Sequence, residues 1–298
     1  MTSGTPRIPV GSRIVATGLG PIECAVVGDG FPVLVLHGSP GGIDAAELMA
    51  GFLPRDQVRS VLVSRPGYLG TPLTDRRSID DQADLLAALL DQLGIARAGV
   101  FSWSGGGPAG YRLAARHPDR VAALVAFAAI SQRYQPRPMG ASERFLMTTS
   151  AGQRVMRWLA ASRPREYIAG VLSSEGSLTK DQIAQRVEEI VADDAKREFV
   201  LAFVPTASQG KRRRVGYRND LMQFAAIDSL ALETITAAAL LVHGSADTDV
   251  PLVDSQKAAT TIPGAQLQIM DAGTHLSLYT HPDATTTQRR VLDFLLAR

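Results

Sequence analysis

The chain has 298 residues, of which 45% are hydrophobic and 20% charged, so it can bury a large core and is neither disordered nor collagen-like. Its 31 basic and 29 acidic side chains leave a net charge of only +2, which argues against a general nucleic-acid binder. The single cysteine, Cys24, can form neither an internal disulfide nor a multi-cysteine metal site. We therefore expect a fold that is stabilised by packing and is compatible with a reducing compartment.

The sequence gives no sign of export or of membrane insertion. Residues 1–10 contain Pro6 and Pro9 and lack the apolar stretch of a secretory signal. Polar residues also interrupt every window of about 18 residues, the length that a membrane-spanning helix requires. We expect a soluble, cytoplasmic protein that does not associate with membranes.

The first part of the chain alternates short aliphatic runs with helical patterns. Residues 13–17 and 22–27 flank a Gly/Pro turn and predict an antiparallel hairpin at the edge of a sheet. Continuous apolar runs then predict strands that are buried on both faces, as in a parallel sheet. A helix is expected between the runs at 58–63 and 99–101, because leucines recur there at helical spacing after a capping-box pair, Ser78 and Asp81. The runs are residues 33–36, 58–63, 99–101 and 124–127.

The pattern changes after residue 131. Residues 132–235 are richer in charged side chains and show helical spacing but no convincing buried strand. Strand character returns at 238–242 and 266–270, and a final amphipathic helix covers 291–296. The sequence therefore predicts an α/β core formed by residues 1–131 and 236–298, interrupted by a mostly helical insertion, with helices on both faces of a mostly parallel sheet.

Ser104 is the first candidate for chemistry. It follows the strand at 99–101 and precedes a helical stretch, in the segment Ser-Trp-Ser-Gly-Gly-Gly. A serine on a sharp strand-to-helix turn projects its hydroxyl above the sheet, next to backbone N–H groups. The usual pattern is G-x-S-x-G, and here Ser102 occupies the first small position.

Three further segments carry polar residues just after predicted strands. They are the glycine-rich turn at 37–42, the segment His243–Pro251, and the segment Gly273–His275. In open α/β sheets the rim at the carboxyl ends of the strands is where ligands bind. We therefore expect these segments to meet Ser104 at one edge of the sheet.

Together these segments resemble the α/β-hydrolase superfamily over nearly the whole chain. The resemblance rests on HGSPGG, RPGYLGTP, SWSGGG, and GSADTDVP followed by GTHLSL, in the chain order Ser, Asp, His. HGSPGG and RPGY are also similar to stretches in proline iminopeptidase-like members. The resemblance implies that residues 132–235 form a cap over the active site.

The resemblance also implies a role for each candidate residue. Ser104 is the expected nucleophile, His275 its general base, and Asp247 the group that orients and stabilises the imidazole. Backbone N–H groups of Ser39 and Gly105 are expected to bind the oxyanion. No metal or organic cofactor is required.

Several residues have competing interpretations. Asp249, Asp254 and Asp271 are neighbouring alternatives to Asp247, which is favoured by its D-x-x-V-P context. His37 and His243 are interpreted as hydrogen-bonded structural residues, and Arg65 as structural rather than substrate-binding. Trp103 and Trp158 are the candidate substrate-binding side chains.

These features predict a serine hydrolase that cleaves a carboxylic ester or lactone with an apolar body. A proline iminopeptidase-like aminopeptidase and a carbon–carbon bond hydrolase are alternatives, because the same triad serves all three reactions. A different class, a small-molecule receptor with an intact triad and little turnover, also stays open. The expected partner is a small molecule, and the sequence does not indicate an oligomeric state.

Overall fold

A computed structural model describes residues 9, 11–206 and 208–297. The expectation that the chain begins without a secretory signal falls mainly on residues 1–8 and 10, which lie outside the described part. The first expected part of the core, residues 1–131, is therefore described at residue 9 and from residue 11 onward.

Eight strands form one sheet in the spatial order β1-β2-β4-β3-β5-β6-β7-β8. The pairs β1–β2 and β2–β4 are antiparallel, and all other neighbouring pairs are parallel. The edge hairpin and the mostly parallel sheet expected from the sequence are thus confirmed. The strands are β1 Arg13–Thr17, β2 Gly20–Val27, β3 Phe31–Leu36, β4 Val58–Val63, β5 Ala98–Trp103, β6 Val121–Phe127, β7 Ala238–Gly244 and β8 Gln266–Met270.

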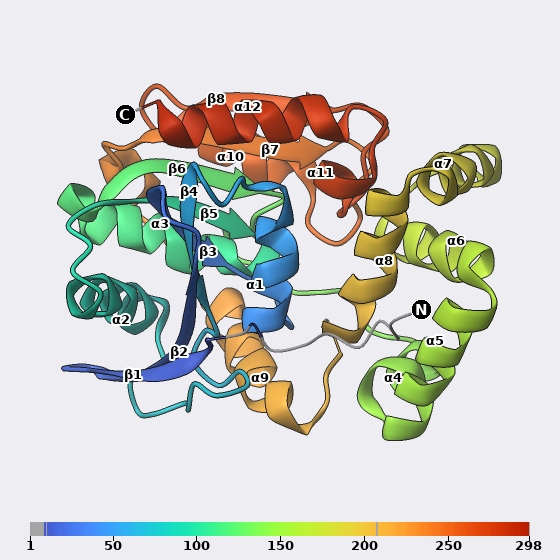
Figure 1. Ribbon diagram of the computed structural model, residues 1–298, viewed down its shortest axis with the longest axis horizontal. Coiled ribbons are helices and arrows are strands. Elements are labelled where there is room, and N and C mark those ends of the chain that lie inside the picture. The colour runs from blue at the N-terminus through green and yellow to red at the C-terminus, as the bar shows by residue number, and fades with distance from the viewer. Residues whose placement is uncertain (1–8, 10, 207, 298) are drawn as a thin grey trace.

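Helices cover both faces of the sheet (Figure 1). One face packs against α2, α3 and α10, and the other against α1, α11 and α12. Helix α2 begins at the predicted capping box, in which the Ser78 hydroxyl accepts from the Asp81 N–H. The core helices are α1 Ile43–Met49, α2 Ile79–Gln92, α3 Gly107–Arg116, α10 Leu252–Thr261, α11 Ser277–Thr280 and α12 Ala284–Leu296.

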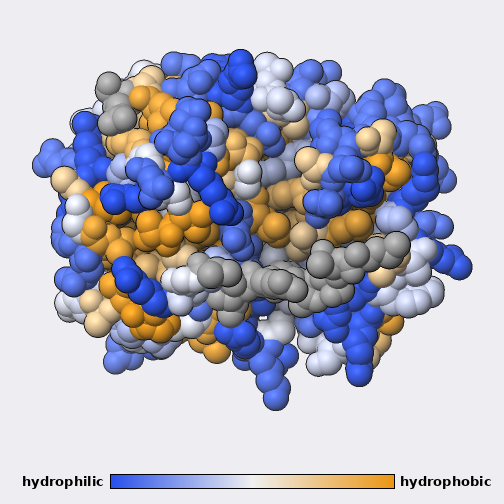
Figure 2. Space-filling view, in the orientation of Figure 1, coloured by the Kyte–Doolittle hydropathy of each residue, from blue (hydrophilic) through white to orange (hydrophobic). Residues whose placement is uncertain are grey.

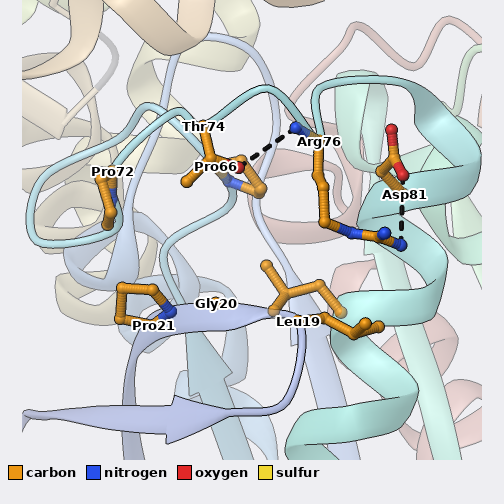
Figure 3. A pocket seen from close by; sticks show the side chains of 9 residues that line it. Leu19, Gly20, Pro21, Pro66, Pro72, Thr74, Arg76 and Asp81 are labelled. Atoms are coloured by element: carbon orange, nitrogen blue, oxygen red, sulfur yellow. Dashed lines mark hydrogen bonds and ion pairs between the residues drawn. The ribbon is translucent and has the colours of Figure 1, made fainter.

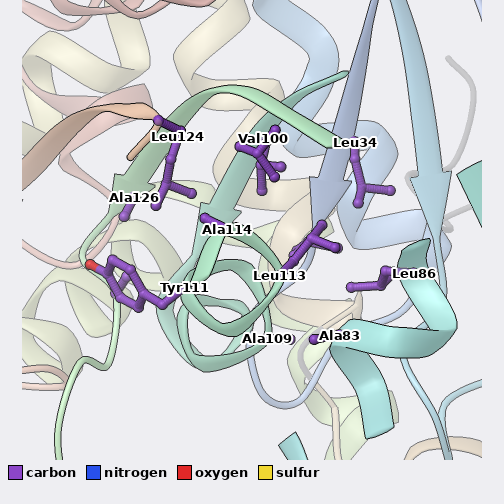
Figure 4. Close-up of a cluster of buried hydrophobic side chains, with 14 of the residues drawn as sticks. Leu34, Ala83, Leu86, Val100, Ala109, Tyr111, Leu113, Ala114, Leu124 and Ala126 are labelled. Atoms are coloured by element: carbon purple, nitrogen blue, oxygen red, sulfur yellow. The ribbon is translucent and has the colours of Figure 1, made fainter. Parts of the chain in front are cut away.

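Alternating side chains of the central strands enter the two cores. Leu34, Val100 and Leu124 point toward α2 and α3, where they meet Leu86 and Leu113 (Figure 4). Because the strands are buried on both faces, they are apolar at successive positions, which is the pattern that identified them.

The segment between β6 and β7 is helical, as expected, and extends to one side of the sheet (Figure 1). Helices α4 to α7 extend to that side, whereas α8 packs against α1 and α11 of the core, and α9 lies beside the loops that follow β3 and β4. The six helices are α4 Ala141–Thr148, α5 Ser150–Ser162, α6 Pro164–Glu175, α7 Lys180–Ala192, α8 Asp194–Thr206 and α9 Lys211–Ala225.

Hydrophilic side chains cover much of the face in Figure 2, with apolar patches between them. Among the helices of the described residues, none combines the length and the hydropathy that crossing a lipid bilayer would require.

Candidate active site

Ser104 lies where β5 ends and a 3-10 turn leads into α3. Its φ is +52°, a left-handed conformation that is strained for a residue with a side chain. Such strain is typical of a nucleophile turn, because the sharp bend lifts the hydroxyl above the sheet. The turn is held in place by the Ile130 N–H, which donates to the Ser104 carbonyl oxygen at 3.1 Å.

The departure from the G-x-S-x-G pattern is accommodated by the neighbouring strand. Ser102 is fully buried, and its hydroxyl donates to the Val125 carbonyl oxygen at 3.3 Å. At the next small position, a Cβ added to Gly105 would lie only 2.5 Å from the Ser39 Cβ. Glycine at 105 therefore lets the nucleophile turn touch the turn after β3.

Asp247 and His275 meet across the loops after β7 and β8. The His275 Nδ1 lies 2.7 Å from the Asp247 Oδ2. The other carboxylate oxygen of Asp247 accepts from the N–H groups of Asp249 at 2.8 Å and Val250 at 3.0 Å. These bonds fix the carboxylate, and they distinguish Asp247 from its neighbour Asp249.

Both members of this pair have shifted pKa values. Burial alone would raise the pKa of Asp247, but His275 and His243 favour the carboxylate and lower the pKa to about 2. Burial likewise opposes a charged His275, whereas the Asp247 carboxylate stabilises the imidazolium and raises the pKa of His275 to about 9. The pair thus favours an ionised carboxylate beside an imidazole that readily holds a proton.

The other core histidines make structural contacts, in keeping with the sequence interpretation. The His243 Nδ1 lies 2.7 Å from the Ser255 hydroxyl and its Nε2 lies 3.0 Å from the Val250 carbonyl oxygen. The His37 Nε2 accepts from the Arg65 N–H at 3.0 Å. Both rings are fully buried.

Glu175 is a buried neighbour of the pair, and the sequence alone does not show that this acidic residue of the insertion faces inward. It ends α6, is only 5% exposed, and accepts from the Thr274 hydroxyl at 2.9 Å. Burial, followed by repulsion from Asp249, raises its pKa well above the ordinary value. Its carbonyl oxygen also accepts from the Thr248 N–H, so the end of α6 is attached to the loop of Asp247. No local motif marks Glu175, because its contacts join segments that are far apart in the chain.

A cavity of about 420 Å³ joins the candidate residues. Ser104, His275 and Ser39 all line it, and the volume lies within the range of small-molecule sites. Its apolar lining includes Trp103, Met139, Met147, Phe203 and Leu221, and its polar lining includes Tyr134, Arg137, Glu143, Gln209, Tyr217 and Asp249.

The two tryptophans lie in different places. Trp103 lines the cavity, is 2% exposed, and stacks on Phe203 with ring centroids 4.8 Å apart. Trp158 lies on α5, is 56% exposed, and is not among the cavity-lining residues described. We therefore withdraw Trp158 as a substrate-binding residue: its helix turns it toward solvent.

A second, much smaller pocket lies beside the edge hairpin and is lined by Leu19, Pro21, Pro66 and Arg76 (Figure 3). Its volume of about 10 Å³ is room for about one water molecule. It is too small for an organic substrate. Among the described residues, no cluster of three His, Cys, Asp or Glu side chains is placed to hold a metal ion.

Comparison with known proteins agrees with this architecture. A family model described as "Alpha/beta hydrolase family" matches residues 33–288. The chain belongs to the α/β hydrolase family. A solved structure, an alpha/beta hydrolase fold protein from Nakamurella multipartita, is 48% identical with a TM-score of 0.94, over 96% of this chain and 99% of that chain.

More distant relatives differ in their named activities. A 2-hydroxymuconate semialdehyde hydrolase from Pseudomonas putida is 26% identical over 86% of this chain and 84% of its own length. The enol-lactonase from Burkholderia xenovorans LB400 is 19% identical with a TM-score of 0.67, over 95% of this chain and 99% of that chain. This second likeness shows a shared fold alone.

Proposed function

We propose that this α/β hydrolase is a serine hydrolase that cleaves a carboxylic ester or lactone with an apolar body. The observation that carries the proposal is the strained Ser104 turn, which shares a cavity with a buried His275 whose Nδ1 contacts Asp247. The apolar body is inferred from the side chains of Trp103 and Phe203 on the cavity wall.

The reaction follows from the ordinary chemistry of these groups. Neutral His275 takes the proton of the Ser104 hydroxyl as the oxygen attacks the carbonyl carbon, and Asp247 stabilises the resulting imidazolium. His275 then returns the proton to the oxygen of the broken C–O bond, which leaves an acyl-enzyme; the resulting alcohol departs from an ester and stays attached to the acyl group of a lactone. A water molecule activated by His275 releases the acid and restores Ser104.

Backbone N–H groups of Ser39 and Gly105 are the proposed oxyanion donors. The two residues are in contact, as the close approach of Gly105 to the Ser39 Cβ requires. Within the described residues, no hydrogen bond uses the Ser39 N–H. It therefore stays available to a substrate oxygen in the cavity.

A second candidate, hydrolysis of a carbon–carbon bond, uses the same three residues. The relative from Pseudomonas putida is named as a hydrolase of 2-hydroxymuconate semialdehyde, so that compound belongs in the substrate panel. Aminoacyl amides test the aminopeptidase alternative. The bond that is cleaved with the highest kcat/KM assigns the class.

The test is hydrolysis of p-nitrophenyl acetate and butyrate by the wild type and Ser104→Ala. We expect a loss of kcat on the order of 10⁶, the size seen when a triad serine is removed from an efficient protease. Ser162→Ala is the matched control, because Ser162 lies exposed at the end of α5 and should leave the rate unchanged. Equal slow rates for wild type and Ser104→Ala would contradict the proposal and favour a receptor.

A further inference from the structure

Arg65 and Asp220 form a buried ion pair between the core and the insertion. Arg65 follows β4 and Asp220 lies on α9, and both are about 1% exposed. The guanidinium donates to the Asp220 carboxylate from both terminal nitrogens, at 2.9 and 2.6 Å. Such a two-pronged pair fixes orientation as well as charge.

The same guanidinium holds the turn after β3. It donates to the carbonyl oxygens of His37 and Gly38, each at 3.1 Å. On the other side of this turn, Arg213 of α9 donates to the Gly41 carbonyl oxygen at 3.0 Å and forms an ion pair with Asp44. Helix α9 therefore fixes the turn that contains Ser39 at both of its ends.

Tyr68 completes the connection to Ser39. Its hydroxyl donates to the Asp220 carboxylate at 2.6 Å and lies 3.0 Å from the Ser39 Oγ. Because the phenol proton is used by Asp220, the Ser39 hydroxyl donates to the Tyr68 oxygen. The ring reaches this position because α9 has a glycine there: a Cβ on Gly216 would lie 2.4 Å from the Tyr68 ring.

We propose that Tyr68 is a positioning residue of the oxyanion site, whose hydroxyl, anchored by Asp220, fixes Ser39 and the turn that lines the cavity beside Ser104. Tyr68 does not line that cavity in the described structure, so it acts through Ser39 rather than on the substrate. The inference rests on the proposed function, because it gives Ser39 a role in binding the oxyanion. If Tyr68 has this role, α9 of the insertion supports catalysis through Asp220, which holds the Tyr68 hydroxyl in place.

The experiment is a double-mutant cycle on ester hydrolysis with Tyr68→Phe, Ser39→Ala and the double variant. Ser39→Ala keeps the backbone N–H and removes only the hydroxyl. We expect each single variant to lower kcat about 10-fold, since a donor displaced by about 1 Å can cost up to about 100-fold. KM should stay within about 2-fold, because the oxyanion forms only in the transition state.

The double variant should be no slower than the slower single variant, because both changes break the same hydrogen bond. Tyr111→Phe is the matched control. Tyr111 is fully buried on α3, and its hydroxyl has no hydrogen-bond partner among the described residues, so kcat should not change.

Two results would overturn the proposal: an unchanged kcat in Tyr68→Phe, or independent effects that multiply in the double variant. If Tyr68→Phe does not fold, Ser39→Ala alone decides, and an unchanged kcat in that variant overturns the proposal. Failure of the proposed function looks different, because the wild type and Ser104→Ala would then hydrolyse the ester at equal rates. The two ideas are tested separately.

Discussion

Helices α5 and α9 belong to the same insertion but relate to the core in opposite ways. Among the described residues, α5 buries only Gly152, and none of its residues lines the cavity of Ser104. Helix α9 buries Asn219, Asp220 and Phe224 and supplies Tyr217 and Leu221 to the cavity wall. The difference shows that the insertion is not a uniform cover: one part holds the strand-end loops in place, and another is surface.

The part of the insertion that is attached to the strand-end loops, here called the anchored part, consists of α9 and the end of α6. There Gly176 forms a β-bridge with Asp247, and the Ser177 N–H donates to the Ala246 carbonyl oxygen at 2.9 Å. The loop of the candidate acid and the turn of the candidate oxyanion donors are thus both attached to the insertion. We expect changes in the anchored part to alter chemistry or stability, and changes in α5 to alter neither.

The largest expected effect is that of Asp247→Asn. We expect kcat to fall about 10⁴-fold, because the imidazole loses the group that holds its tautomer and stabilises its charge. The wild-type kcat/KM should rise with pH as His275 loses its proton, toward the pKa of about 9 that Asp247 imposes. Without the carboxylate that pKa falls, so the rising limb should move to lower pH.

A pH–rate profile of both proteins checks this prediction. Asp249→Asn is the control. Asp249 lines the cavity, but among the described residues its carboxylate makes no hydrogen bond to the His275 ring, so its effect on kcat should be smaller. A rising limb at the same pH in wild type and Asp247→Asn would contradict the assignment of the pair.

Asp220→Asn tests the attachment of α9. Removing one partner of a buried ion pair leaves the other charge uncompensated, so we expect the free energy of unfolding to fall by about 3–5 kcal/mol. Urea unfolding measures the loss of stability. Asp228→Asn is the control, because Asp228 is exposed and lies just after the end of α9. A loss no larger than that of the control would show that α9 is not held by this pair.

The smallest effect is expected at Trp158→Ala. Its side chain is more than half exposed on α5, so we expect kcat/KM to stay within about 2-fold and stability within about 0.5 kcal/mol of the wild type. Trp103→Phe is the comparison, because its ring contacts the cavity and lies 5.8 Å from the His275 ring. A large loss of kcat/KM or of stability in Trp158→Ala would contradict the difference proposed between α5 and α9.

The sequence predicted the core better than the insertion. The strands around Leu34, Val100 and Leu124 were identified because strands buried on both faces are apolar at successive positions. Helix α2 was identified by its capping box and its leucine spacing. Such local patterns directly express the burial that they predict.

The site was predictable only where a motif follows a strand. Asp247 and His275 lie at strand ends, so their proximity follows from the parallel sheet. Asp220 and Glu175 lie on helices of the insertion, and their contacts with Arg65 and Thr274 depend on tertiary packing that no local spacing encodes. The prediction for Trp158 was wrong for the same reason: an aromatic residue on a helix does not reveal which face is covered.

The central claim is that Ser104 is an activated nucleophile, and covalent trapping tests it most directly. The protein is incubated with a fluorophosphonate, and the labelled residue is located by mass spectrometry of its peptides. We predict one label per chain, on Ser104, with none on Ser104→Ala under the same conditions. An unlabelled Ser104 in a wild-type protein that still hydrolyses esters would contradict the account.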